Sequence, residues 1–263
     1  MKRSPIGEAL TKNSGSRKVG LARALSKLGY CSRQKAAALI RQGQVRLNGA
    51  RPRNPETPVR MGVDRIELQG RPVRAAECIY WMMNKPRGLI TSAADEKGRD
   101  TVYSLLPADM KWIAPVGRLD KASEGLLLLT NDSEWSARVT EPATHLDKTY
   151  QVQVGAIASA ELLETLQRGV ETERGEVLRC KRASLLRAGE KHSWIEIVLD
   201  EGKNRQIRRM LDARGVEVLR LIRVAIGPLQ LGELPKGTHR PLTFDELASL
   251  NRAMSSARTK VPR

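Results

Sequence analysis

The chain has 263 residues and a formal net charge of +17, so it is long enough to bury a substantial core and to hold more than one domain. No stretch approaches the roughly 18 apolar residues of a membrane-spanning helix, and the first residues lack the apolar segment of a signal peptide. The three cysteines and three histidines are scattered without metal-ligand or disulfide spacing, so we expect a cytoplasmic protein with no metal site and no membrane partner.

The positive charge is concentrated at the start of the chain. Residues 1–76 hold 17 Lys and Arg against 4 Asp and Glu, a net charge of +13, whereas residues 77–263 hold 29 against 25, a net charge of +4. This uneven density favours a polyanionic partner, because each phosphate that is neutralised releases condensed counterions. An anionic membrane would attract the same charge, but the segment lacks the wide apolar face that membrane binding requires. Nucleic acid is therefore the expected partner.

The first folded segment is predicted to begin after a polar arm. Residues 1–16 contain Gly and Ser among their cations and predict a flexible basic arm. Leu21, Leu25 and Leu28 then recur at helical spacing, and Gly29 is placed to end that helix.

A second helix and small strands follow. Ser32 is a candidate N-cap for a helix that ends at Gly43. The next stretch, QVRLNG, alternates like a strand and ends in the tight turn Asn48–Gly49, and DRIELQGRPV repeats the pattern of strand and turn. The helices leave cations on their polar faces, and we expect these to contact RNA: Arg23, Lys27, Arg33, Lys35 and Arg41.

This block, residues 17–77, resembles an S4 RNA-binding domain. The resemblance lies in the helix pair, in the CSR between the helices and in the GQVRLNG that follows them. S4 domains lay their two helices against structured RNA, so the resemblance implies the same partner as the charge distribution.

The composition changes from Glu77 onward. CIYWMMNKPRGLITS predicts a strand closed by a loop, and neither GxxxxGK[ST] nor GxGxxG occurs, so we expect no nucleotide cofactor. We expect residues 78–250 to form one α+β body and residues 251–263 a polar tail. Further strands are predicted at 126–130, 149–154, 193–199 and 216–224, and helices near 133–139, 158–169 and 204–214.

One acid in this body occupies an unusual place. In PVGRLDKASEGLLLLTND, Asp120 lies on an irregular segment that feeds the buried strand at 126–129, with Arg118 two residues before it. No second acid, histidine or cysteine lies beside it in the sequence. Alone, such an acid indicates a structural salt bridge, but KTYQVQV supplies Tyr150 at the start of a strand and EGKNRQIRRML supplies an arginine cluster at the start of a helix.

Together these segments resemble the pseudouridine synthases, specifically the branch with a leading S4 domain that modifies ribosomal RNA. GRLD…SEGLLLLTND, KTY, NRQIRRM and RLIRVAIG occur in the family's order. The resemblance implies an S4 domain followed by a mixed β-sheet catalytic body with flanking helices. It also implies isomerisation of uridine to pseudouridine without a cofactor, acting on ribosomal RNA or a ribosome assembly intermediate, as a monomer that requires no protein partner.

The resemblance also implies roles for single residues. Asp120 is the expected nucleophile, which either attacks the ribose or removes a ribose proton. Tyr150 stacks on the target base or relays the proton lost from C5, and Arg208 is the expected guanidinium facing Asp120. Arg205 is expected to contact RNA, and Arg118 is expected either to position backbone phosphate or to fill the space left by the extruded base. The target base must leave its stack because its reacting atoms are otherwise inaccessible.

Other functions remain open at this point. The substrate expected from the resemblance is large-subunit (23S) rRNA, with small-subunit (16S) rRNA or a tRNA as alternatives. A non-catalytic S4 adaptor is a further alternative. A hydrolase is the last, although glycosidases pair two carboxylates and only Glu124 lies near Asp120 in the sequence.

Overall fold

The computed structural model describes residues 18–92, 98–107, 110, 112–173 and 175–258. The chain divides into two units, of which the first ends at Glu77 and the second begins at Cys78, where the composition changes. The expected basic arm at 1–16 lies outside the described residues. None of the helices in these ranges is long and apolar enough to cross a membrane.

The first unit is built on two short helices, α1 (Leu21–Lys27) and α2 (Arg33–Arg41). The Ser32 side chain accepts a hydrogen bond from the Lys35 amide at 3.1 Å, which confirms it as the N-cap of α2. Buried aliphatic side chains from both helices pack against small strands to form this unit's core. The strands are β1 (Val19–Gly20) paired with β3 (Pro58–Val59), and a sheet of β2 (Val45–Leu47), β4 (Ile66–Leu68) and β5 (Arg71–Pro72).

Two tight turns shape the small sheet. Asn48 and Gly49 both have positive φ, at 50° and 85°, and Gln69 and Gly70 repeat this at 50° and 79°. Consecutive residues with positive φ suit the turns that join twisted antiparallel strands, and Asn and Gly adopt this conformation at low cost. The predicted turn at Asn48–Gly49 is therefore confirmed.

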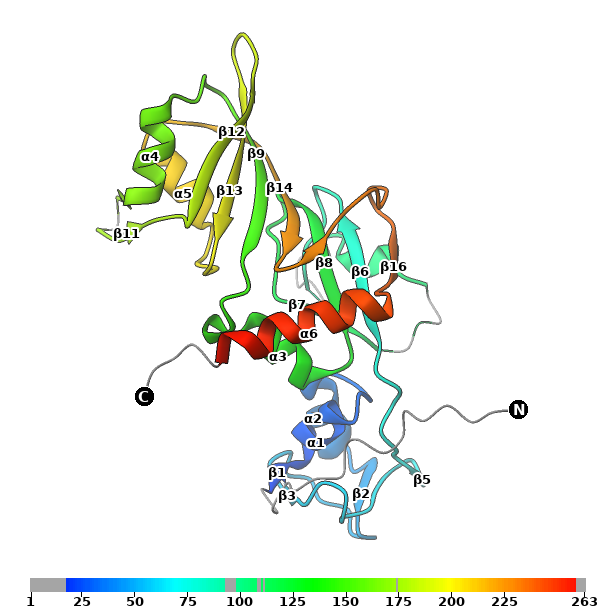
Figure 1. Ribbon diagram of the computed structural model, residues 1–263. Helices are drawn as coiled ribbons and strands as arrows, with labels where there is room; N and C mark the ends of the chain where they lie inside the picture. Colours follow the sequence, from blue (N-terminus) through cyan, green and yellow to red (C-terminus); the bar gives the residue numbers. More distant parts are fainter. Residues whose placement is uncertain (1–17, 93–97, 108–109, 111, 174, 259–263) are drawn as a thin grey trace. The chain divides into compact units, whose positions relative to one another are not determined.

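The second unit is organised around one nine-stranded mixed sheet (Figure 1). The neighbouring strands along it are β12 (Arg182–Ala188), β13 (Ser193–Leu199), β9 (Lys148–Val154), β14 (Val218–Ile226), β8 (Glu124–Thr130), β6 (Tyr80–Lys85) and β16 (His239–Pro241). In addition, β7 (Ala114–Val116) pairs with β8 and β15 (Leu229–Gln230) pairs with β14. A separate pair is formed by β10 (Val170–Glu171) and β11 (Val177–Leu178).

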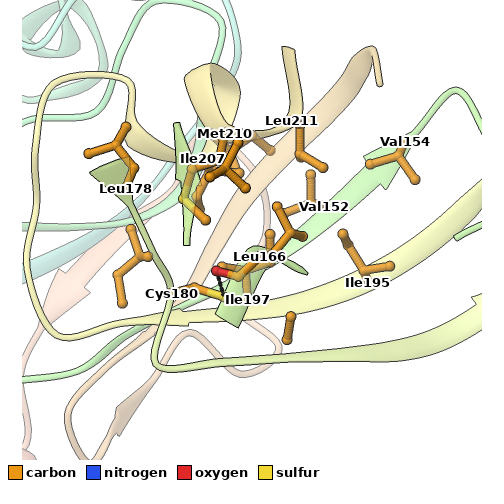
Figure 2. Packing of buried hydrophobic residues seen from close by; sticks show 14 of the residues in the cluster. Val152, Val154, Leu166, Leu178, Cys180, Ile195, Ile197, Ile207, Met210 and Leu211 are labelled. Atoms are coloured by element: carbon orange, nitrogen blue, oxygen red, sulfur yellow. Dashed lines mark hydrogen bonds between the residues drawn. The ribbon is translucent and has the colours of Figure 1, made fainter. Parts of the chain in front are cut away.

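Helices cover this sheet and bury its apolar side chains. They are α3 (Ser133–Thr140), α4 (Ala160–Arg168), α5 (Gln206–Asp212) and α6 (Phe244–Arg258), with short 3₁₀ turns at Val102–Leu105 and Pro142–Thr144. Figure 2 shows Val152 and Ile197 of the sheet facing Met210 and Leu211 across the core beneath α5. A second cluster packs α3 and α6 against β6 and β8.

The expected polar tail is wrong for residues 251–258. Helix α6 runs through Arg258, and its own residues Leu250 and Met254 are buried. The Trp135 indole N–H also donates a hydrogen bond of 3.0 Å to Asn251 Oδ1. Leu250 and Met254 are four residues apart and therefore lie on one face of the helix. This apolar face anchors a helical end whose composition is otherwise polar. Residues 259–263 lie outside the described residues.

At the centre of the sheet, the backbones of the parallel strands β8 and β14 come close together. Strands β8 and β14 pair only at Glu124 with Ile222 and at Gly125 with Arg223. Gly125 has φ 102°, and a Cβ placed there would lie 2.3 Å from the Arg223 carbonyl oxygen. Glycine is therefore required at this position both for its backbone conformation and for the contact with β14.

Candidate active site

Asp120 lies on the loop that joins β7 to β8, as the sequence predicts. The loop is tied down beside it, because Thr91 Oγ1 donates to the Leu119 carbonyl at 2.8 Å and the Ser123 amide donates to the Asp120 carbonyl at 3.0 Å. The Asp120 side chain remains 35% exposed. The carboxylate is thus held on a fixed backbone while staying accessible to a ligand.

A buried cation supports this loop from below. Lys85, at the end of β6, is fully buried, and its ammonium donates hydrogen bonds to the carbonyls of Pro86, Asp120 and Ser123 at 3.1, 3.2 and 2.9 Å. Burial lowers the pKa of Lys85 to about 8, against the opposing attraction of Asp120 and Glu124. Lys85 was absent from the predicted site because the sequence offers no sign that this lysine is buried.

A cavity of about 510 Å³ opens beside Asp120. It brings together four of the residues that the sequence singled out, namely Asp120, Arg118, Tyr150 and Arg205. Tyr150 comes from β9, where it also packs against the apolar clusters on either side. Residues far apart in the chain therefore meet around one carboxylate.

Arg205 is the arginine that reaches Asp120. Its Nη1 lies 3.9 Å from Asp120 Oδ2, and its backbone adopts the left-handed conformation at φ 50° immediately before α5. The buried Gln206 fixes this turn, since its side-chain amide donates to the Arg179 carbonyl and to Glu201 Oε1 and accepts from the Lys203 amide. A non-glycine residue held in this strained conformation at a cavity is typical of a functional site.

Arg208, the guanidinium expected to face Asp120, is not among the residues that line the cavity. Its guanidinium donates instead to the carbonyls of Ala122 and Val218, each at 3.2 Å. Burial, followed by the nearby Arg205 cation, lowers the pKa of Arg208, while Asp120 opposes the shift. Arg208 therefore lies within the electrostatic reach of Asp120 but supports its loop through the backbone.

Arg209, the next arginine of α5, does not line the cavity either. Its Nη2 forms an ion pair with Glu176 Oε2 at 2.6 Å and also donates to Thr172 Oγ1 at 3.4 Å. Hydrogen bonds from Arg209 and from Lys203 lower the pKa of the Glu176 carboxyl. Arg209 thus ties α5 to the segment around β10 and β11.

The cations expected to bind RNA in the first unit lie on its two helices. Arg23 on α1 and Arg33, Lys35 and Arg41 on α2 are exposed, and Lys27 is half-buried. Four of the five expected cations are thus exposed on the surface of this unit.

Glu124 is not positioned as a second acid. It is buried and accepts hydrogen bonds from Arg220 and Lys236, and none of these three residues lines the cavity. Burial acts to raise its pKa, but those two cations lower the pKa of the carboxyl overall. A carboxyl held ionised in two ion pairs is unsuited to protonate a leaving group, which removes support for the paired-carboxylate hydrolase.

Further cations at the site were missed by the sequence analysis. Lys148 of β9 and Arg223 of β14 both line the cavity. Arg223 stands inside a largely apolar strand, whereas Lys148 is the first residue of the KTY motif. Among the described residues, no group of three or more His, Cys, Asp or Glu side chains could hold a metal ion.

We expect the three arginines to respond differently to replacement by leucine. Arg205→Leu should lower single-turnover product formation about tenfold, about 1.4 kcal/mol, with little change in thermal unfolding, because it removes the cation beside Asp120. Arg208→Leu should lower both the rate of product formation and the thermal unfolding temperature. The reason is that the carbonyls of Ala122 and Val218 lose a donor, at a cost of about 2 kcal/mol. Arg209→Leu should affect unfolding alone. Equal effects of Arg205→Leu and Arg209→Leu on the rate would contradict the assignment of Arg205.

Comparison with known proteins agrees with this geometry. Residues 79–213 match the RNA pseudouridylate synthase family, and residues 19–64 match the S4 domain. In structure, the chain is similar to a crystal structure of a pseudouridylate synthase, with a TM-score of 0.63 and 28% identity, covering 88% of this chain and 99% of the other.

Two relatives span nearly the whole chain. Ribosomal large subunit pseudouridine synthase B of Bacillus subtilis is 40% identical over 88% of this chain and 94% of its own length. An uncharacterized RNA pseudouridine synthase of Aquifex aeolicus is 37% identical over 88% of this chain and 92% of its own. The predicted α+β fold, with an S4 domain ahead of the body, is confirmed. The chain belongs to the RNA pseudouridylate synthases and is an enzyme of the isomerase class.

Proposed function

We propose that the enzyme converts a specific uridine of ribosomal RNA to pseudouridine, with large-subunit rRNA as the substrate. The observation that carries the proposal is Asp120, an accessible carboxylate on a fixed loop, which lines a cavity of about 510 Å³ together with Tyr150 and Arg205. A cavity of this size accommodates one extruded nucleotide. The name of the Bacillus relative supports the choice of large-subunit rRNA.

In the proposed reaction the target base leaves its stack and enters the cavity. Asp120 either attacks C1′ or removes a ribose proton, and in both routes the bond from C1′ to N1 breaks. The base turns and C5 bonds to C1′, which displaces the Asp120 carboxylate in the first route and is accompanied by return of the ribose proton in the second. The proton then leaves C5 and N1 gains a proton, so the net composition is unchanged. Tyr150 stacks on the ring or relays the proton, while Arg205 balances the charge of Asp120 and Arg118 positions the RNA backbone.

The proposed roles are divided between the two units of the chain. Residues 17–77 serve as the RNA-binding unit, and the body that begins at residue 78 performs the chemistry. The enzyme acts in the cytoplasm as a monomer, on rRNA or an assembly intermediate of the ribosome. Arg208 supports the reaction by holding the Asp120 loop.

Mapping pseudouridines in cells that lack the gene tests the substrate. Carbodiimide treatment followed by primer extension should reveal one pseudouridine missing from large-subunit rRNA. The wild-type gene should restore it and the Asp120→Asn gene should not. Loss of a modification in small-subunit rRNA or a tRNA instead would reassign the substrate, and an unchanged set of modifications would favour the non-catalytic adaptor.

A separate prediction concerns the first unit. Removal of residues 1–77 should weaken RNA binding and flatten the dependence of log K on log salt, by about 0.9 for each phosphate that is no longer neutralised. Turnover at saturating RNA should persist, because Asp120, Tyr150 and Arg205 all lie beyond the cut. Circular dichroism must first show that the fragment is folded.

A variant of the full chain provides the matched control for this deletion. Arg33→Ala combined with Lys35→Ala removes two exposed cations from α2 and leaves its core intact. It should reduce the salt slope in the same direction as the deletion. A slope unchanged in both proteins would show that this unit does not contact RNA phosphates.

A further inference from the structure

Two cations on neighbouring strands line the cavity beyond the residues used so far. Lys148 lies at the start of β9, two positions before Tyr150, so both side chains point to the same face of the sheet. Arg223 of β14 is the cross-strand partner of Tyr150. The two cations therefore flank the tyrosine that the proposed function places against the base.

Arg223 is built into the wall in an unusual way. Its side chain is only 6% exposed, and its Nε donates to the Leu126 carbonyl at 2.8 Å. Its Nη2 is also buried, yet has no hydrogen-bond partner among the described residues. An unpaired buried N–H of a charged group is costly, so a guanidinium kept in this state at a cavity indicates a ligand that completes its hydrogen bonds.

Lys148 adds a second positive charge to the same place. It is half-buried, and burial followed by the repulsion of Arg223 lowers the pKa of its ammonium, while Asp147 and Asp200 oppose the shift. Neither acid is part of the cavity lining. Asp147 is already bound by Lys181 through both carboxylate oxygens, at 2.7 and 3.0 Å, and Asp200 is exposed.

The acids within the cavity are engaged elsewhere. Among the described residues of the lining, the carboxylates are Asp120, paired with Arg205, and Glu201, which accepts from Gln206 and lies 3.6 Å from Lys203. Lys148 and Arg223 are therefore left without an acid in the lining. Two neighbouring cations in a partly desolvated cavity lining interact more strongly with a fully charged anion than with a neutral carbonyl group.

We propose that Lys148 and Arg223 form a phosphate subsite in the active-site cavity, which binds a phosphodiester of the RNA next to the target uridine. Arg223 supplies the planar donor group and Lys148 the second charge, and both lie on rigid strands rather than on loops. The subsite fixes the position of the extruded nucleotide relative to Asp120. This inference rests on the proposed function and adds to it the group by which the substrate is held.

Binding of small nucleotides tests the subsite without requiring turnover. Uridine 5′-monophosphate should bind the wild-type protein about tenfold more tightly than uridine, and Lys148→Met should abolish that difference. Lys148→Arg should restore most of it, because the charge is kept. Lys181→Met, which removes the other lysine beside Asp147 but lies outside the cavity, should bind both ligands as the wild type does.

RNA binding provides the second measurement. Lys148→Met in the full chain should weaken binding of a uridine-containing rRNA fragment about tenfold and lower the salt slope by about 1. Unchanged binding together with a slower rate would overturn the proposal, since the two cations would then act on the base. Equal affinities for the monophosphate and for uridine in the wild type would also overturn it. Both readouts measure binding, so they are independent of which RNA is modified in the cell.

Discussion

Asp120→Asn is expected to abolish formation of pseudouridine while leaving the fold and RNA binding intact. Asparagine has nearly the same shape as aspartate, but its amide is neither a nucleophile for C1′ nor a base for a ribose proton. The side chain is partly exposed, and the loop is held by backbone contacts of Leu119, Asp120 and Ser123 that asparagine preserves. A loss of at least 10⁴-fold, about 5.5 kcal/mol in activation free energy, is the expected scale.

Release of tritium from RNA labelled at C5 of uridine measures this loss directly. Glu196→Gln is a matched control, because it also neutralises one carboxylate, yet Glu196 lies on β13 in an ion pair with Arg182 outside the cavity. The control should retain wild-type rates. Turnover by Asp120→Asn above trace level would show that the carboxylate is not the reacting group.

Lys85→Met is expected to have the largest effect on stability. The change removes the shared donor of three backbone carbonyls, those of Pro86, Asp120 and Ser123. Methionine fills a similar volume but cannot hydrogen-bond them, so we expect a loss of about 3 kcal/mol in the free energy of unfolding. Because the Asp120 loop is no longer fixed, product formation should fall as well.

The pH dependence distinguishes this lysine from a surface one. Its pKa in the folded protein is about 8, below its ordinary value of 10.5. Between these values the unfolded chain binds more protons than the folded chain, so the contribution of Lys85 to the free energy of unfolding rises with pH and is smallest below pH 8. The stability gap between the wild type and Lys85→Met should therefore widen from pH 8 to pH 10.

Lys121→Met is the control for both measurements, since Lys121 is exposed on the same loop. Its removal should shift neither the unfolding free energy nor the pH profile by more than a few tenths of a kcal/mol. Chemical denaturation followed at several pH values gives the comparison. A constant gap between the wild type and Lys85→Met across this range would contradict the buried, shifted lysine.

The sequence predicted the order of the main elements because their patterns are local. The apolar run at 126–129 and the alternation at 149–154 mark strands that the structure confirms as β8 and β9. Asp120 and Tyr150 could be selected because the motifs around them resemble a known family. The S4 unit was recognised from Ser32 and the turn at Asn48, which are also local signals.

The choice of Arg208 over Arg205 as the partner of Asp120 depended on where a helix begins. A helix from residue 204 would place Arg205 one turn before Arg208 on the same face. The structure begins α5 at Gln206, and the left-handed turn at Arg205 sends that side chain into the cavity instead. Single-sequence patterns give no signal for such a turn when no glycine or asparagine occupies it.

The buried cations could not be found for a different reason. Lys85, Lys148 and Arg223 are indistinguishable in the sequence from cations on solvated faces, since their burial results from contacts between strands distant in the chain. The helical end at 251–258 was missed because its polar composition outweighed two anchoring residues, Leu250 and Met254. In each case the burial depends on tertiary contacts, which the local sequence pattern does not reveal.

The short parallel contact between β8 and β14 has a mechanical consequence for the active site. Asp120, Arg118 and Lys85 belong to the part of the sheet that contains β6, β7 and β8, whereas Tyr150, Lys148 and Arg223 belong to the part that contains β9 and β14. The two parts share only two paired positions along the sheet, at Gly125 and its neighbour Glu124. The proposed nucleophile and the proposed phosphate subsite thus lie on the two sides of this short parallel contact, and Gly125 permits the close approach of β8 to β14 there.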